Sequence, residues 1–95
     1  MIETHIHTPS CKIQAIEDGH EVGLLEFEIH ENILTITHTY AYQKGRGIGK
    51  MLMSAAIAYA REQHYKILPV CSFARVILQR NDAYKDLWID EEQTT

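Results

Sequence analysis

The stretch QKGRGIGK, residues 43–50, lies between a run of alternating apolar residues and a run of helix-forming composition, and it carries three glycines and three basic side chains. Glycines let a backbone approach a ligand closely, and the amides at a helix N-terminus hold phosphate oxygens. A Walker loop needs glycine at position 44 and Ser or Thr at 51, and a dinucleotide fingerprint needs glycine at 50, where this chain has Lys44, Met51 and Lys50. The stretch predicts another kind of phosphate-binding turn, with a tight turn of purely structural use as the alternative.

The residues before this stretch predict an antiparallel β-meander. Three runs, residues 12–17, 21–30 and 33–40, are separated by short connections that contain turn-forming residues. In the second run, apolar residues such as Leu25 and Phe27 alternate with polar ones, so we expect a sheet with one buried face and one solvent-facing face.

The third run continues this alternation toward the glycine-rich stretch. If Leu34 and Ile36 point into the core, then His38 and Tyr40, which follow at spacings of two, share that side. We therefore expect His38 and Tyr40 on the core side of the sheet, near the C-terminal end of the strand.

The residues after the stretch predict a βαβ unit and C-terminal helices. Residues 48–63 have helix-forming composition with apolar positions three and four apart. Residues 66–71 form a short apolar strand, which a right-handed crossover makes parallel to the strand over 33–40. Pro69 cannot donate to a ladder, so this strand lies at an edge or separates from its neighbour at that point. We expect a second helix over 72–79, an irregular or helical segment over 82–88 and a frayed tail over 90–95.

The length of 95 residues leaves room for one domain with a modest core. We expect residues 1–95 to form a single α/β (α+β) domain whose core spans residues 12–88. The longest apolar run, residues 55–60, is far shorter than the roughly 20 residues that cross a bilayer. The start of the chain has no signal-peptide pattern, and two cysteines are too few for a disulfide framework. We expect an untargeted cytoplasmic protein that does not bind membranes.

Charge is distributed unevenly along the chain, whose net charge is −4. Residues 1–43 hold one basic and seven acidic residues, whereas residues 44–80 hold seven basic residues and one acidic residue. The net charge argues against a general nucleic-acid binder, and the local basic patch indicates a compact polyanionic ligand. The alternative is that these charges only solvate helix faces.

The six histidines show no spacing typical of a metal site. His5 and His7 lie in what we expect to be a loose N-terminus, and no HExxH or CxxC motif occurs. We expect no bound metal.

Several segments of the chain together resemble the GCN5-related N-acetyltransferase superfamily. Its signature, Arg/Gln-x-x-Gly-x-Gly/Ala between a strand and a helix, corresponds to the six residues from Lys44 to Gly49, with lysine in place of the usual first residue. The likeness extends over residues 12–88 and is to a minimal single-domain subfamily of roughly a hundred residues. The further matching segments are His38-Thr39, GRGIGKMLM from position 45, AxxYARE ending at Glu62, KILPVCSFA over 66–74 and NDAYKDLW over 81–88.

This resemblance implies acetyl-coenzyme A as cosubstrate. The strands over 33–40 and 66–71 are then expected to splay, with the pantetheine between them and main-chain groups of Ala41 and Tyr42 near the pantetheine or the acetyl carbonyl. The amides of Gly45, Arg46, Gly47, Ile48, Gly49 and Lys50 are expected to hold the pyrophosphate. The candidates for the 3′-phosphate are Lys44, Arg46, Lys50 and Arg75.

Three residues are candidates for catalysis, each with a structural alternative. Cys71 precedes a predicted helix, whose dipole favours a thiolate, but it also suits a small core position. His38 is a candidate general base or a partly buried structural histidine. Tyr84 is a candidate acid for the departing thiolate, by the resemblance, or a packing aromatic. Direct attack by an amine and transfer through Cys71 both remain open.

Three functions follow from these observations. The first is acetyl-coenzyme A-dependent N-acetyl transfer to an unknown amine, either a small molecule or a protein lysine. The second is a coenzyme A binding or sensing module with little turnover. The third is an interaction domain whose basic patch docks an acidic partner. The acid-rich residues 1–43 favour a cationic acceptor such as a polyamine or a lysine side chain, with the alternative that these charges only form the solvent-facing side of the sheet. We expect a monomer or a weak homodimer.

Overall fold

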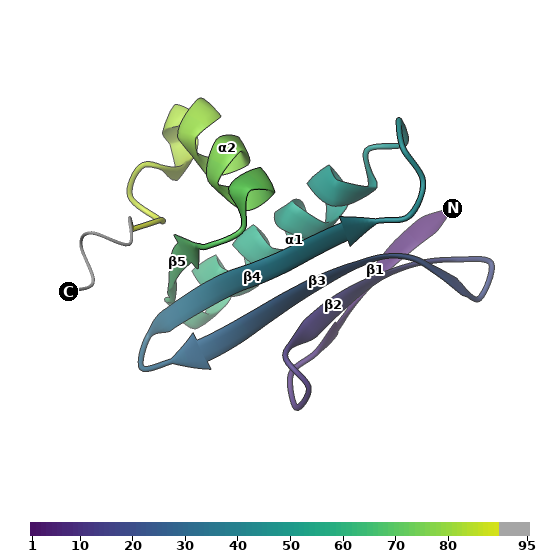
Figure 1. Ribbon diagram of the computed structural model, residues 1–95. Helices are drawn as coiled ribbons and strands as arrows, with labels where there is room; N and C mark the ends of the chain where they lie inside the picture. Colours follow the sequence, from purple (N-terminus) through teal and green to yellow (C-terminus); the bar gives the residue numbers. More distant parts are fainter. Residues whose placement is uncertain (90–95) are drawn as a thin grey trace.

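The computed structural model describes residues 1–89, so the tail expected over 90–95 lies outside the described residues. The chain forms a mixed α/β fold, as the sequence predicts, and its sheet has five strands, one more than the sequence predicts (Figure 1). The elements are β1 (Ile2–His7), β2 (Lys12–Glu17), β3 (His20–His30), β4 (Ile33–Ala41), α1 (Ile48–Gln63), β5 (Lys66–Pro69), α2 (Ser72–Arg80) and the 3-10 turn η1 (Asp82–Tyr84).

The strands lie in the order β1-β2-β3-β4-β5. The first four are antiparallel, and β5 joins β4 in parallel after the crossover through α1, which confirms the meander and the βαβ unit. Helix α1 packs against all five strands and covers one face of the sheet. Its buried side chains, among them Leu52 and Ala56, meet Leu25, Phe27 and Leu34 in one core.

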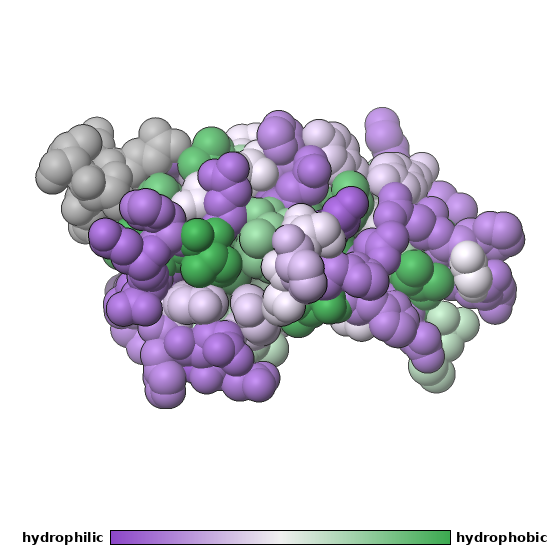
Figure 2. Space-filling model, turned by 90° about the horizontal axis from the view of Figure 1, so that it is seen from below, coloured by the Kyte–Doolittle hydropathy of each residue, from purple (hydrophilic) through white to green (hydrophobic). Residues whose placement is uncertain are grey.

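The surface is mostly hydrophilic when the protein is viewed from below, and hydrophobic residues reach it in separate patches (Figure 2). Within residues 1–89, no helix is long and apolar enough to cross a membrane.

The N-terminus is a strand, so the expectation of a loose N-terminus is wrong. Strand β1 pairs with β2 along its whole length, from Ile2 opposite Glu17 to His7 opposite Lys12. Ile or Thr alternates with Glu or His along β1. This is the period of two expected of a strand, although most of the residues are polar. Backbone pairing therefore decides the conformation of a segment that buries little apolar surface.

A β-bulge interrupts β4 at Thr37. Glu26 of β3 lies opposite His38, but the next residue, Phe27, lies opposite Ile36, so Thr37 is an extra residue in β4. A bulge of this kind shifts the alternation of side chains by one position.

The bulge overturns the prediction that His38 and Tyr40 face the core. Ile36 is buried, whereas the His38 side chain is 59% exposed and Tyr40 is exposed as well. Thr39 lies opposite the buried Leu25 and so takes the side facing α1. The prediction assumed an unbroken period of two, and one inserted residue reverses every side chain beyond it.

Strands β4 and β5 separate after a short paired region. Their ladder runs only as far as the Ile36–Pro69 pair. The Ile36 carbonyl then accepts hydrogen bonds from the amides of Val70 and Cys71, both at 3.1 Å, and the chain turns into α2. Because β4 continues to Ala41, its last residues have no partner in β5, and we call this unpaired edge of β4 the gap. This confirms the predicted splay, although β5 ends two residues earlier than expected.

Gly23 of β3 tests how closely α1 approaches the sheet. A Cβ there would lie 2.5 Å from Ile48 Cγ2 and 3.0 Å from the Tyr40 carbonyl oxygen. We expect Gly23→Ala to lower the free energy of unfolding by about 1–3 kcal/mol, measured by urea denaturation, because the methyl group overpacks the contact. The control Gly19→Ala, whose Cβ would meet nothing within 4 Å at a φ of +82°, should cost about 1 kcal/mol through backbone conformation alone. An unchanged stability of Gly23→Ala would contradict this close packing.

Candidate active site

The loop between β4 and α1 has a backbone that its glycines make possible. Gly45 and Gly47 have φ angles of +79° and +71°, in the left-handed region that favours glycine. A Cβ at either position would meet nothing within 4 Å, so both residues border open space. Gly47 is the N-cap of α1, and no side chain among the described residues caps that helix. Unpaired amides beside open space suit a phosphate group.

Gly49 serves a different purpose, which the sequence did not reveal. A Cβ at Gly49 would lie 2.6 Å from the ring of Phe73, so the glycine lets this ring of α2 lie directly against the first turn of α1. Beyond this contact the two helices leave a groove of about 450 Å³. Its lining includes Lys50 and Ser54 of α1, Val76 and Arg80 of α2, and Tyr84 of η1.

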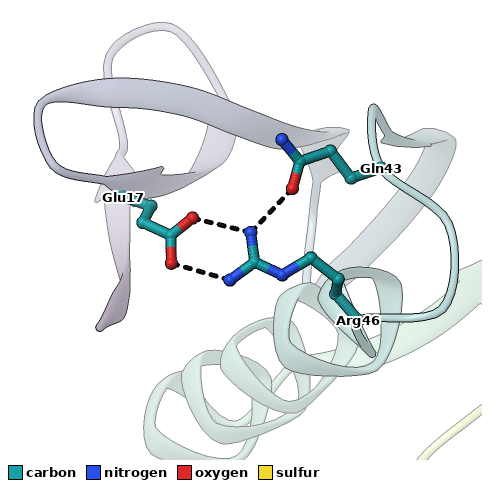
Figure 3. A network of polar contacts seen from close by, with 3 residues as sticks. All are labelled: Glu17, Gln43 and Arg46. Carbon is teal, nitrogen blue, oxygen red and sulfur yellow. Dashed lines mark hydrogen bonds and ion pairs between the residues drawn. The ribbon is translucent and has the colours of Figure 1, made fainter.

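The Arg46 side chain connects the loop to the end of β2 through hydrogen bonds (Figure 3). Its guanidinium donates two hydrogen bonds to the Glu17 carboxylate, at 2.6 and 2.7 Å, and a third to Gln43 Oε1 at 2.6 Å. The guanidinium holds the pKa of Glu17 below its usual range, and the carboxylate raises the pKa of Arg46. Arg46 therefore has a protein partner that a phosphate would have to share or replace.

The other 3′-phosphate candidates are placed differently. The Arg75 guanidinium donates to the Pro69 carbonyl oxygen at 3.4 Å, under the end of β5. Lys44 and Lys50 are exposed near the start of α1. Lys50 shares the groove with Arg80, a residue that the sequence motifs did not single out. The sequence alone does not indicate that Arg80 lines this groove, because the groove forms only where α2 packs against α1.

Cys71 lies where the chain leaves β5, as the N-cap of α2. It is half-buried, and its Sγ is 3.7 Å from the Thr39 hydroxyl. Because Thr39 points to the side that α1 covers, the Cys71 thiol lies on that same side, next to the end of the β4–β5 ladder. The thiol is thus placed at the gap and is not part of the central core.

His38 projects from the opposite side of β4. Its Nδ1 is 3.6 Å from a Glu26 carboxylate oxygen, and its ring is stacked with that of Tyr40, with centroids 5.7 Å apart and planes at 5°. Tyr84 lies in η1 and lines the groove between the helices. The structure therefore brings Cys71 and His38 to two sides of one strand and places Tyr84 elsewhere.

Metal-ligating side chains do not gather in groups of three or more anywhere in residues 1–89. Both cysteines are free thiols.

The Tyr42 side chain anchors the start of the loop by a hydrogen bond on the face of the sheet opposite α1. Its hydroxyl donates to Glu21 Oε2 at 2.7 Å, and Gln14 Nε2 donates to the other oxygen of that carboxylate at 2.7 Å. These bonds lower the pKa of Glu21. The backbone amide of Tyr42 donates to the Val22 carbonyl at 3.0 Å, so it points toward β3 and away from the gap. This orientation favours Ala41 over Tyr42 as a main-chain contact for a molecule in the gap.

The Tyr42–Glu21 bond gives a measurable titration. The hydrogen bond to the carboxylate, together with partial burial and the negative charge of Glu21, raises the pKa of Tyr42 to about 12. NMR of ring-labelled tyrosine should show Tyr42 ionising about two pH units above an ordinary tyrosine, whose pKa is about 10. Glu21→Gln should return the midpoint toward 10, since the carboxylate that accepts the hydrogen bond and makes the largest contribution to the raised pKa is then gone. A Tyr42 midpoint near 10 in the unmodified protein would contradict the contact.

Comparison with solved structures places this fold among acetyltransferases. A GCN5-like N-acetyltransferase candidate from Staphylococcus aureus, solved in solution by NMR, is 27% identical with a TM-score of 0.75, covering 93% of this chain and 88% of that chain. A ribosomal-protein-alanine N-acetyltransferase from Brucella melitensis biovar Abortus 2308 is 23% identical with a TM-score of 0.58, covering 73% of this chain and 60% of its own. An IAA acetyltransferase from Bacillus cereus ATCC 14579 is 16% identical with a TM-score of 0.58, and the match covers 84% of this chain and 73% of that chain.

At those identities the last two structures show the fold alone. No curated protein matches the sequence significantly. The family model described as GCN5-related N-acetyl-transferase matches residues 12–87, which include the glycine-rich loop, the parted strands and Cys71. The chain therefore belongs to the GCN5-related N-acetyltransferase family.

Proposed function

We propose that the protein transfers an acetyl group from acetyl-coenzyme A to an amine. The observation that carries this proposal is the gap between β4 and β5, which opens beside a glycine-rich helix N-terminus. Such a gap leaves backbone groups of β4 available to a ligand, because in a strand the N–H and C=O groups of successive residues point to opposite sides. A ligand that is extended at one end and phosphorylated at the other fits this arrangement.

The residues present fit coenzyme A. The open space beside Gly45 and Gly47 and the free amides of the first turn of α1 would hold the pyrophosphate. Lys50 of α1 and Arg80 of α2, which both line the groove between the helices, would attract the 3′-phosphate. The Ala41 main chain would contact the pantetheine arm or the acetyl carbonyl. Bound there, the cosubstrate supplies a thioester carbonyl that a nucleophile can attack.

Cys71 is the side chain best placed to receive the acetyl group. It is half-buried, lies at the end of the paired region and is the N-cap residue of α2. His38, on the other side of β4, would take the proton of the acceptor amine. Tyr84 lines the groove that would hold the nucleotide end, so we assign it to binding instead of to protonation of the thiolate.

Coenzyme A at 100 times its dissociation constant should stabilise the protein by about 2.7 kcal/mol, seen as a rise in Tm. Gly47→Glu should abolish that rise, because a carboxylate then fills the space assigned to the pyrophosphate. Gly19→Glu is the matched control: its φ is +82° and its Cβ would also meet nothing within 4 Å, but it lies in the β2–β3 turn. Equal Tm shifts in Gly47→Glu and the unmodified protein would rule out the loop as the binding site.

Mass spectrometry tests the role of Cys71. Acetyl-coenzyme A alone should leave an acetyl group on Cys71, and Cys71→Ala should lose turnover while it still binds coenzyme A. Cys11→Ala, which removes the other free thiol, should keep both properties. Full turnover by Cys71→Ala would exclude transfer through the thiol and leave direct attack by the amine. Binding of coenzyme A without acetylation of any amine would instead identify a sensing module.

A further inference from the structure

The two outer edges of the sheet are built differently (Figure 1). Strand β5, at one edge, is short and contains Pro69, and the segment after η1 runs along its outer side. There the Ile67 amide donates to the Leu87 carbonyl at 2.9 Å, and the Ile89 amide donates to the Ile67 carbonyl at 2.8 Å. Strand β1, at the other edge, has six residues and no proline, and among residues 1–89 only β2 pairs with it. The chain closes one edge and leaves the other available for pairing.

The outer side of β1 presents backbone hydrogen-bonding groups. In an antiparallel ladder, alternate residues point their N–H and C=O groups to the neighbouring strand, and the residues between them point these groups outward. The register between β1 and β2 is unbroken over the whole strand, so β1 carries no bulge that would twist its edge away. Every second residue of β1 therefore offers an amide and a carbonyl to a further strand.

The side chains of β1 are complementary to a second copy of β1 in antiparallel orientation. Residues directly opposite each other in such a pair point to the same face of the sheet. With a two-fold axis at Thr4, this residue lies opposite its own copy, and Glu3 lies opposite the partner's His5. Ile2 then lies opposite the partner's Ile6. Each contact joins residues that suit one another, an acid with a histidine or an isoleucine with an isoleucine.

Neighbouring registers lack this match. An axis between Thr4 and His5 would place these two residues opposite each other, although they point to different faces of the sheet. Thr4 shares the side of Ala15, which is buried beneath α1, whereas His5 shares the opposite side with Gln14. With the axis on Glu3 or on His5, that residue would meet its own copy, and the acid–histidine pairs would be lost.

The exposure and charge of β1 favour this pairing. Glu3 and His5 are both exposed, and within one chain the distance from His5 Nε2 to Glu3 Oε2 is 3.4 Å. Neighbouring strands are about 5 Å apart, so each Glu3 would lie between its own His5 and the partner's His5. On the face that α1 covers, Ile6 is 38% exposed although it lies opposite the buried Ile13, and the partner's Ile2 would cover it.

We propose that the outer edge of β1 is a self-association site, at which a second copy of the chain pairs antiparallel about a two-fold axis at Thr4. The two sheets join into one continuous sheet, with α1 of both copies on the same face. Strands β2 and β3 separate β1 from the gap, so the interface leaves both candidate active sites free, and the association does not depend on acetyl transfer. A single short strand pair buries less than a standard interface of about 1,600 Å², so the dimer is weak.

Sedimentation velocity of the full chain between about 10 µM and about 1 mM tests the association. The weight-average mass should rise from that of a monomer toward that of a dimer as the concentration increases. A constant monomer mass up to about 1 mM would overturn the proposal.

A histidine-to-glutamate change at each unpaired strand edge tests where the copies meet. His5→Glu should raise the Kd of the dimer about tenfold, because the two-fold axis repeats each new contact between acids. His38→Glu makes the same change at the unpaired edge of β4 and is the matched control. An unchanged Kd for His5→Glu, or an equal increase for His38→Glu, would overturn the assignment to β1.

A mixture of two charge variants tests the register. Glu3→Lys removes the acid of each pair, and His5→Glu places two acids opposite each other, so each variant alone should associate less than the unmodified protein. In an equimolar mixture, the new lysine of one variant meets the new glutamate of the other, and the dimer should reappear. Both positions are exposed, so the monomer should fold normally in either variant. A mixture no more associated than its separate components would contradict the pairing of Glu3 with the partner's His5.

Discussion

At the end of the parallel ladder, the Ile36 carbonyl accepts the amides of both Val70 and Cys71, directly after Pro69, which has no amide to donate. This arrangement ends β5 and starts α2, while β4 continues to Ala41. The gap, the position of the Cys71 thiol and the approach of α2 to α1 all depend on it. The amides of Lys66 and Val70 point to β4 and that of Ile67 points away to Leu87, so position 69 faces the outer edge of β5, where a proline removes no hydrogen bond to β4.

The Thr37 bulge adds a second constraint, because it decides which side chains face each side of the gap. Thr39 and the Cys71 thiol lie on the side of α1, where the glycine loop and the helix groove also lie. His38, Glu26 and Tyr40 lie on the other side. The bulge therefore places the two candidate catalytic side chains, Cys71 and His38, on opposite faces of the sheet.

The sequence predicted the features that depend on local patterns. Alternation and turn residues indicated the meander, the glycines indicated the strand-to-helix loop, and Pro69 indicated an edge strand, the position that β5 takes in the sheet. It missed β1, whose pattern is mostly polar, and the bulge, which depends on the register between two strands and leaves no mark within β4 itself. Side-chain partnerships across the fold, such as Arg46 with Glu17, were likewise invisible because they join residues far apart in the chain.

A crystal structure of the full chain with acetyl-coenzyme A tests the central claim, that the separation of β4 and β5 creates the cosubstrate site. The account predicts the pyrophosphate on the amides of residues 45–50, the pantetheine between β4 and β5, and the thioester within reach of Cys71. Coenzyme bound away from the parted strands, for example beside Arg61 and Lys66 at the far end of α1, would contradict it.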